Sequence, residues 1–381
     1  MALAGTMRMA RTLFPSPRCV VAYPRDTHAS QHEIATQLCL SRKLAQLLQC
    51  RLLEPYQADR LRSPATYYYV PDRTLIGSFP ARELGIDDET QLFGGIVPHD
   101  FVASKAITHG LWRRTSAAPQ DWSHTLTETL GDTVLQGYTA FSHDDAARAG
   151  TALLDEGPIR MKPIYANAGR GQRVVRDRDE LAHALCEMTE ITRGIVLEEN
   201  LTDLETYSVG WCRVRGHVLA YVGTQELTRD NRGHEVYGGS TLRCIRADPD
   251  ALLALDITPR ERQAITLAMR YDAAVNEAYP SLIASRRNYD IAVGQSASGA
   301  RRAGVLEQSW RAGGASIAEV AALLHFARHP DCQALNAYTR ERYGPTSARS
   351  GSDDLVFQGV DGRAGWLTKT GGIARGNDGG A

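Results

Sequence analysis

Four lysines stand out in this chain because arginine supplies nearly all of its positive charge. Among 43 basic residues only Lys43, Lys105, Lys162 and Lys369 are lysines. A lysine ammonium is a compact point charge that suits a phosphate group. Lys162 lies at the end of a predicted strand, 159–162, which Pro163 ends, and it precedes a turn of small residues at 167–171. A lysine beside such a loop of backbone N–H groups could bind the phosphates of a nucleotide. The alternative is a plain β-hairpin with glycines in its turn, which is the commoner case on spacing alone.

Three glutamates follow the next strand-like run. Glu198 ends that run, and Glu205 comes seven residues later, just before another strand begins. The irregular stretch between them, around Leu201, has free N–H and C=O groups that could pair with the edge of an adenine. The carboxylate of Glu205 could accept both hydroxyls of a ribose. Glu199 could replace Glu198, although the seven-residue separation favours Glu198, and an acidic surface turn remains the alternative.

Two further carboxylates lie on consecutive strand-like runs near the end of the chain. Asp290 is in the first run, and Glu307 interrupts the second, which otherwise reads as a buried strand. Carboxylates on neighbouring strands can hold one or two Mg²⁺ ions together with substrate phosphates. Arg311 follows at a spacing that would place it near a transferred phosphoryl group. The alternative for Asp290 is a charge on an edge strand.

These elements, in this order, resemble the ATP-grasp superfamily of carboxylate–amine ligase-like enzymes. The superfamily pattern is a strand lysine with a glycine loop, an E-x-x-L hinge before a second Glu, an acidic strand and an E-x-N-x-R strand. Its earlier lysine looks like Ser104-Lys105-Ala106 here. The resemblance covers about residues 100–325, and two of the four lysines fall on its two lysine positions. It departs from the pattern at Ser309, where the superfamily usually has Asn as a third metal ligand.

The resemblance implies a role for each matching residue. Phosphates would be bound by Lys105, Lys162 and the loop glycines Gly169 and Gly171. Adenine would meet Glu198 and the backbone near Leu201, and ribose would meet Glu205. The metal ligands would be Asp290, Glu307 and Ser309, and the catalytic residues would be Arg311 and Lys162. The implied cofactors are ATP and Mg²⁺.

The chemistry implied by the resemblance is ADP-forming ligation of small molecules. A substrate carboxylate would attack the γ-phosphate of ATP to give an acyl phosphate, and an amine or another nucleophile would then displace phosphate. Two other functions stay open at this point. One is an ATP-binding sensor or scaffold without ligase activity, and the other is direct phosphoryl transfer to a small molecule.

Several elements must position these residues, and their order indicates an α/β (α+β) class. The resemblance makes this an ATP-grasp fold with an N-terminal Rossmann-like α/β domain. We expect four regions: an N-terminal α/β domain at 1–100, a small or lid region at 101–200, a large region with the metal site at 201–343, and a disordered glycine-rich tail at 344–381. Strands are expected at 19–23, 65–70 and about 91–97, with a helix at about 30–50 between the first two. A short helix carrying Lys105 is expected at 104–113.

The second half has better marked elements. Thr258, Pro259 and Glu261 predict a capped helix that extends to Ala278. A final apolar helix is expected at 316–328. Arg286 and Arg287 could bind a substrate carboxylate, but neighbours on a strand point to opposite faces, so at most one should reach the site.

Composition excludes several classes of protein. A net charge of −1 over 381 residues gives no footprint for nucleic acid or an anionic membrane surface. No apolar run approaches the roughly 20 residues that span a bilayer. Seven cysteines without a CxxC pair argue against a disulfide scaffold or a zinc ribbon. We therefore expect a cytoplasmic protein that acts on small molecules, with a homo-oligomer as one option.

Overall fold

The N-terminal unit is a small parallel sheet with one helix beside it. The computed structural model describes residues 17–24, 29–54, 67–166, 171–345 and 354–374. The sheet order is β2-β1-β3, and the elements are β1 (Cys19–Tyr23), α1 (Gln31–Leu47), β2 (Arg51–Leu53) and β3 (Tyr67–Pro71). The α1 helix begins at a capping box, in which Ser30 and Glu33 satisfy each other's backbone N–H groups. This unit matches the α/β arrangement expected for the N-terminal region.

Two segments of the first 113 residues differ in detail from what the sequence predicts. The strand predicted near 91–97 is present as the shorter β5 (Gly95–Val97), which pairs with β4 (Leu75–Ile76) and β13 (Ile283–Ala284) in a separate sheet. An isolated bridge between Leu92 and Tyr69 links this stretch to the parallel sheet. The segment around Lys105 is no α-helix but two 3₁₀ turns, Asp100–Ala103 and Lys105–Thr108. The side chain of Ser104 caps the second turn, which directs Lys105 toward the interior.

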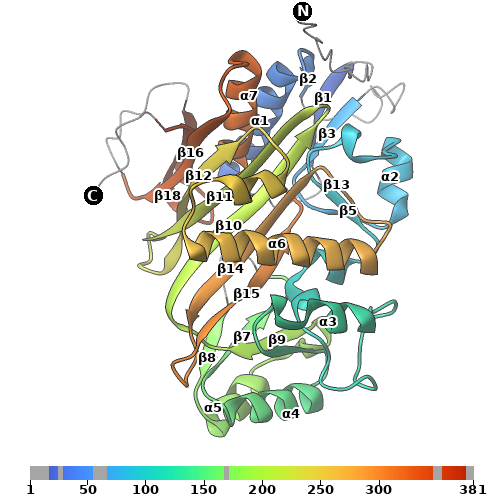
Figure 1. Cartoon of the computed structure of the whole chain (residues 1–381), viewed down its shortest axis with the longest axis vertical. Helices are drawn as coiled ribbons and strands as arrows, with labels where there is room; N and C mark the ends of the chain where they lie inside the picture. Colours follow the sequence, from blue (N-terminus) through green and yellow to red (C-terminus); the bar gives the residue numbers. More distant parts are fainter. Residues whose placement is uncertain (1–16, 25–28, 55–66, 167–170, 346–353, 375–381) are drawn as a thin grey trace, which may run out of the picture.

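The region that the sequence analysis expects to be a lid contains a four-stranded sheet, named the lid sheet below, with two helices on one side (Figure 1). Its sheet order is β6-β9-β7-β8, and its own core contains Met161, Leu181 and Leu197. The elements are α3 (His124–Leu130), β6 (Gly137–Ala140), α4 (His143–Leu154), β7 (Ile159–Pro163), β8 (Arg173–Val175), α5 (Arg178–Cys186) and β9 (Ile195–Glu199). The side chain of Ser142 caps α4 and that of Asp177 caps α5.

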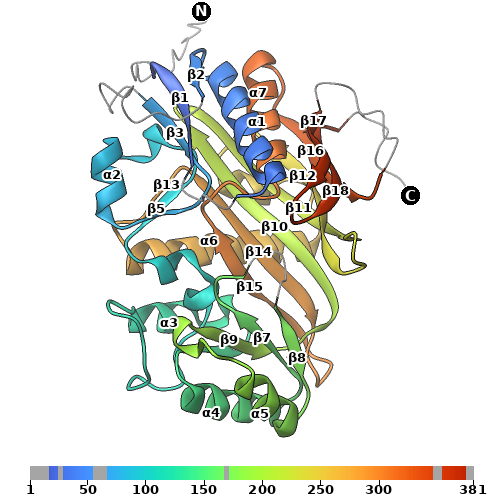
Figure 2. The ribbon, with the colours of Figure 1, turned by 180° about the vertical axis from the view of Figure 1, so that it is seen from behind.

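A large eight-stranded sheet forms the centre of the molecule, in the order β15-β14-β10-β11-β12-β16-β18-β17. The α6 helix crosses one face (Figure 1), and α1 and α7 cover part of the other (Figure 2). The elements are β10 (Thr202–Val214), β11 (His217–Arg229), β12 (Glu235–Ile245), α6 (Pro259–Ala278), β14 (Arg286–Gln295), β15 (Arg301–Ser309), α7 (Ser316–Arg328), β16 (Ala334–Tyr343), β17 (Leu355–Asp361) and β18 (Gly365–Ile373). The capped helix and the final apolar helix lie where the sequence predicts them.

The prediction of a disordered tail from residue 344 is wrong for residues 354–374. This part forms β17 and β18, which extend the large sheet beyond β16. Glycine content misled the sequence argument, because Gly371 is small for a packing reason: a Cβ there would lie 2.6 Å from Ile317 of α7. The carboxylate of Asp361 accepts hydrogen bonds from the backbone and ring of His32, which ties β17 to α1.

Two global features complete the description. In the part of the chain described here, no helix is long and apolar enough to cross a membrane. All seven cysteines fall within the described ranges, and each is a free thiol.

Candidate nucleotide and metal site

Lys162 and Glu198 form a buried ion pair inside the lid sheet. They lie on neighbouring strands β7 and β9, where Lys162 is opposite Val196 and therefore diagonal to Glu198 on the same face. Their side chains are 3% and 2% exposed, and the ammonium contacts the carboxylate Oε1. The pair places one lysine charge at the end of β7, next to the turn that follows this strand.

His109 completes this buried group. Its Nε2 donates to the other carboxylate oxygen of Glu198, at 3.1 Å. Room for the ring comes from Gly137, which is opposite Glu198 on β6: a Cβ there would lie 2.8 Å from the imidazole. Burial by itself would raise the pKa of Glu198, but the charge of Lys162 and the hydrogen bond from His109 lower it to about 2. Glu198 is therefore ionised and held by two neighbours.

Lys105 connects the lid to the large sheet. Its buried ammonium lies 2.5 Å from Oε2 of Glu307 on β15 and also donates to the carbonyl of Ala166, in the turn after β7. Gln308 holds the segment that carries this lysine, since its amide donates to the carbonyls of Val102 and Ser104 at 3.0 and 2.6 Å. Lys105 thus links the phosphate-loop candidate to the metal-ligand candidates.

Asp290 and Glu307 face each other across β14 and β15. They are register partners, and a bulge follows immediately at Leu306. The amide of Gln225 on β11 donates to Oδ1 of Asp290 at 2.7 Å. Burial and the neighbouring charge of Glu307 raise the pKa of Asp290 to about 7. Two carboxylates that disfavour each other's ionisation are typical of a site where a cation would relieve the repulsion.

The donor set suits Mg²⁺ bound together with phosphates. Over the described ranges no group of three or more His, Cys, Asp or Glu side chains forms a complete metal site. Mg²⁺ commonly takes one or two carboxylates and fills its shell with water and substrate phosphates. Asp290 and Glu307 fit that requirement. Ser309 is engaged elsewhere, because its hydroxyl accepts a hydrogen bond from Arg286 at 3.3 Å.

Arg311 lies two residues beyond the end of β15. Burial lowers the pKa of its guanidinium, and the charge of Glu307 acts in the opposite direction. Its Nη1 donates to the carbonyl of Ala312 at 2.9 Å. The guanidinium is thus within electrostatic range of a candidate metal ligand, at the start of the glycine-containing turn that leads into α7.

Glu205 does not join this group. It is the register partner of Val293 and lies on the face of the sheet that α6 covers. Asp290 lies on the other face. Its carboxylate pairs with Arg260 of α6 and accepts a hydrogen bond from Tyr207 at 2.8 Å. The contacts of Glu205 therefore give no support to its expected role at a ribose.

The remaining predicted residues divide between described and undescribed parts. Leu201 is buried against Leu135 and Ala292 at the junction of the lid and the large sheet. Gly171 has a φ of +69°, which a glycine adopts readily. Gly169 lies outside the described residues.

Arg286 and Arg287 point to opposite faces, as strand alternation predicts, and both are paired. Arg286 meets Glu319 of α7, and Arg287 meets Asp272 of α6. Neither has the exposed guanidinium that a substrate clamp requires.

The sequence did not single out His109, Gln225 and Glu319. Glu319 is a charged residue within an apolar helix, and a hydrogen-bonded core residue gives the same signal. His109 and Gln225 have polar neighbours, Thr108 and Glu226, so no local pattern distinguishes them.

Comparison with known structures identifies the architecture. D-alanyl-alanine synthetase A from Vibrio cholerae is 13% identical, with 82% of this chain and 94% of that chain covered at a TM-score of 0.51. The biotin carboxylase domain of 2-oxoglutarate carboxylase from Hydrogenobacter thermophilus, crystallised with MgADP and bicarbonate, is 12% identical. The match covers 93% of this chain and 86% of that chain, at a TM-score of 0.52. A biotin carboxylase from Campylobacter jejuni is 11% identical, with 93% of this chain and 87% of that chain covered at a TM-score of 0.51. The chain has the ATP-grasp fold, and at these identities the likeness concerns the fold alone.

The family model described as "Protein of unknown function (DUF3182)" matches residues 20–371. The chain belongs to that family. No curated protein matches it significantly.

Proposed function

We propose that this protein is an ATP- and Mg²⁺-dependent ligase that joins a small-molecule carboxylate to an amine or another nucleophile. One observation carries the proposal: the ammonium of Lys105 lies between Glu307, which is opposite Asp290, and the turn that follows Lys162. One cation and two carboxylates from two parts of the chain thus lie where the lid sheet meets the large sheet, and Lys162 is on the strand that leads into the same turn. A triphosphate with a bound metal has the complementary charges.

The proposal assigns a role to each of these residues. Lys105 and Lys162 bind phosphates, Asp290 and Glu307 ligate Mg²⁺, and Arg311 stabilises charge on the transferred phosphoryl group. Glu198, fixed by His109, orients Lys162 and lies beside the adenine. The lid is residues 101–200, and the metal-bearing large region begins at 201.

Catalysis in this arrangement is positioning and charge neutralisation. Held by Asp290 and Glu307, Mg²⁺ would supply neutralisation of the phosphate charge. The ammonium of Lys105 would move from Glu307 to a phosphate oxygen as that carboxylate takes up the metal. Closure of the lid would then keep water away from the acyl phosphate.

The test is calorimetric binding of Mg·ATP to the wild type and to four variants. Lys105→Met and Glu307→Gln each remove one converging group, and Lys162→Met combined with Glu198→Gln removes the lid pair without leaving an unpaired buried charge. Lys43→Met on α1 is the matched control, because it removes a lysine that contacts none of these groups. We expect about tenfold weaker binding in the site variants and unchanged binding in the control.

Product analysis then separates the remaining functions. Release of ADP with an acid and an amine, together with an amide product, supports ligation. A stable phosphorylated product would indicate phosphoryl transfer instead. Binding of Mg·ATP without turnover across acids and amines would indicate a sensor, and a wild-type protein that binds neither ATP nor ADP would contradict all three functions.

A further inference from the structure

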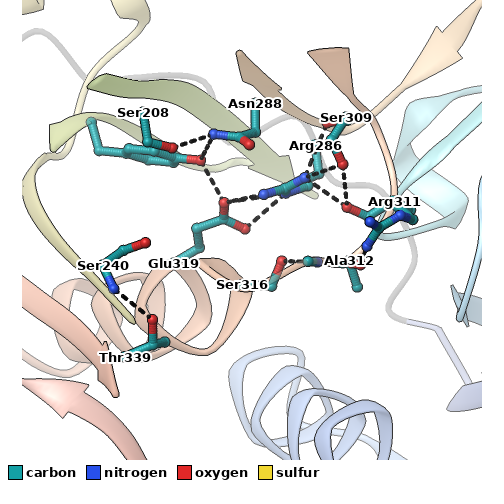
Figure 3. A network of polar contacts seen from close by, with 12 residues as sticks. Ser208, Ser240, Arg286, Asn288, Ser309, Arg311, Ala312, Ser316, Glu319 and Thr339 are labelled. Atoms are coloured by element: carbon teal, nitrogen blue, oxygen red, sulfur yellow. Dashed lines mark hydrogen bonds and ion pairs between the residues drawn. The ribbon is translucent and has the colours of Figure 1, made fainter. Parts of the chain in front are cut away.

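The most buried ion pair of the large sheet joins Arg286 at the start of β14 to Glu319 on α7 (Figure 3). The two side chains are 1% and 0% exposed. Nε of Arg286 donates to the two carboxylate oxygens at 3.2 and 3.0 Å, and Nη2 donates to Oε1 at 2.7 Å. This bidentate geometry requires a planar guanidinium and could not be made by an ammonium.

The third nitrogen of Arg286 reaches the end of β15. Its Nη1 donates to the carbonyl of Ser309 at 3.0 Å and to the carbonyl of Arg311 at 2.6 Å. It also donates to the hydroxyl of Ser309 at 3.3 Å. One side chain therefore holds the backbone on both sides of Trp310, at the point where the strand that carries Glu307 turns toward α7.

The carboxylate of Glu319 is held in turn. Tyr221 on β11 donates its hydroxyl to Oε1 at 2.6 Å. The amide of Asn288 donates to the oxygen of Tyr221 at 3.1 Å and to the hydroxyl of Ser208 at 2.6 Å (Figure 3). The charge of Arg286 is thus neutralised within the protein, so Arg286 can act on a ligand only through the strand end that it holds.

We propose that Arg286, oriented by Glu319, is a positioning residue that sets the backbone of Ser309 and Arg311 so that Arg311 meets the γ-phosphate. This positioning role rests on the proposed function. A buried ion pair is weak evidence for stability, because apolar residues of similar volume often serve as well. Three hydrogen bonds from one guanidinium to a single strand end are better accounted for by placement of that strand end.

The neighbouring pair offers a matched control. Arg287 is the next residue on β14 and makes the same kind of strand-to-helix bridge, to Asp272 of α6 at 2.9 Å. It lies on the opposite face, and it donates hydrogen bonds to Asp272 and to the carbonyl of Ala284 rather than to the end of β15. Arg287→Lys therefore tests the effect of weakening a strand-to-helix ion pair without moving the end of β15.

The experiment compares Arg286→Lys with Arg287→Lys. Calorimetry measures the Kd of Mg·ADP and that of a Mg-bound, non-hydrolysable ATP analogue, and thermal unfolding gives Tm. We expect Arg286→Lys to raise the Kd of the analogue about tenfold and that of ADP less than twofold, since only the analogue has a γ-phosphate. Arg287→Lys should leave the ratio of the two Kd values unchanged, whatever its Tm.

A second variant keeps the test independent of an unpaired charge. Arg286→Met with Glu319→Leu removes both charges together, so it should retain the fold. It should still lose affinity for the analogue more than for ADP. Equal changes for both nucleotides, or none, would overturn the positioning role while the ligase proposal stands. A wild-type protein that binds neither nucleotide would overturn both.

Discussion

Buried charges in the candidate site are balanced by close partners, and those partners define what each residue can do. Glu198 is held ionised by Lys162 and His109, whereas Asp290 opposite Glu307 has a pKa raised to about 7. Buried carboxyl groups whose pKa values are shifted by specific charged partners are common in functional sites. The two cases lead to opposite effects of pH on stability.

For Asp290 we expect a variant that is more stable than the wild type. The raised pKa means that the folded state binds the proton more tightly than the unfolded chain, so stability is lost as pH rises from about 4 to 7. Asp290→Asn removes this effect. At pH 8 without metal, its free energy of unfolding, measured with urea, should therefore exceed that of the wild type by on the order of 1 kcal/mol. The gain should vanish at pH 4.

The control for that measurement is Asp179→Asn on the exposed side of α5. It should show no comparable gain at pH 8. With Mg·ATP present the order should reverse, since the wild type gains stability from the metal that Asp290 helps to bind. Equal stability of Asp290→Asn and the wild type at pH 8 would contradict the repulsion argument.

Lys162 and Glu198 should show strong non-additivity. Lys162→Met leaves a buried carboxylate without its main counter-charge and should cost about 3–5 kcal/mol at pH 7. Adding Glu198→Gln should recover most of that loss, which urea unfolding would measure as a double-mutant cycle. Because the pKa of Glu198 is lowered, its stabilising effect is present above about pH 4.5 and is lost as pH falls toward 2. Additive losses would show that the two side chains act independently.

At the scale of elements, β17 and β18 complete the large sheet. Lys369 of β18 lies 2.8 Å from Glu341 of β16, and both are buried. Leu367 is fully buried, and Asp361 links the hairpin to α1. These contacts stabilise the face on which α1 and α7 pack.

A chain that ends at Gly344 should therefore lose stability. It would leave Glu341 buried without its cation and would expose the long edge of β16, so we expect a loss of at least about 3 kcal/mol and a tendency to aggregate. A chain that ends at Ala374 keeps β17 and β18 and is the control. Urea midpoints that agree between these two chains would contradict this prediction.

At the scale of the whole molecule, the lid and the large sheet meet through Lys105. A ligand that binds both parts should lower the rate at which they separate. Mg·ATP should thus slow hydrogen exchange in the turn after β7 and in Lys105–Thr108. Exchange in β16 should not change, and slowing confined to β16 would contradict a site at the junction.

Elements that are specified by residues close together in the chain could be predicted from the sequence. The capping box at Thr258 and Glu261, the periodicity of α7 and the strands around Lys162 and Asp290 need only neighbours along the chain. The order of the lysines and carboxylates, together with the resemblance it carries, predicted the ATP-grasp fold. Local patterns failed at Lys105, where a 3₁₀ turn packed against β15 replaces a helix.

Only the tertiary structure decided which face each charge occupies and which partner it meets. The alternation of side chains along a strand places Arg286 and Arg287 on opposite faces of the sheet. Which helix, α6 or α7, packs on each face depends on contacts between segments far apart in the chain. The same applies to Glu205, which pairs with Arg260 of α6, and to β18, where Gly371 fits against α7. Pairing between distant segments has no local period, so the sequence alone could list these charged residues but not match them.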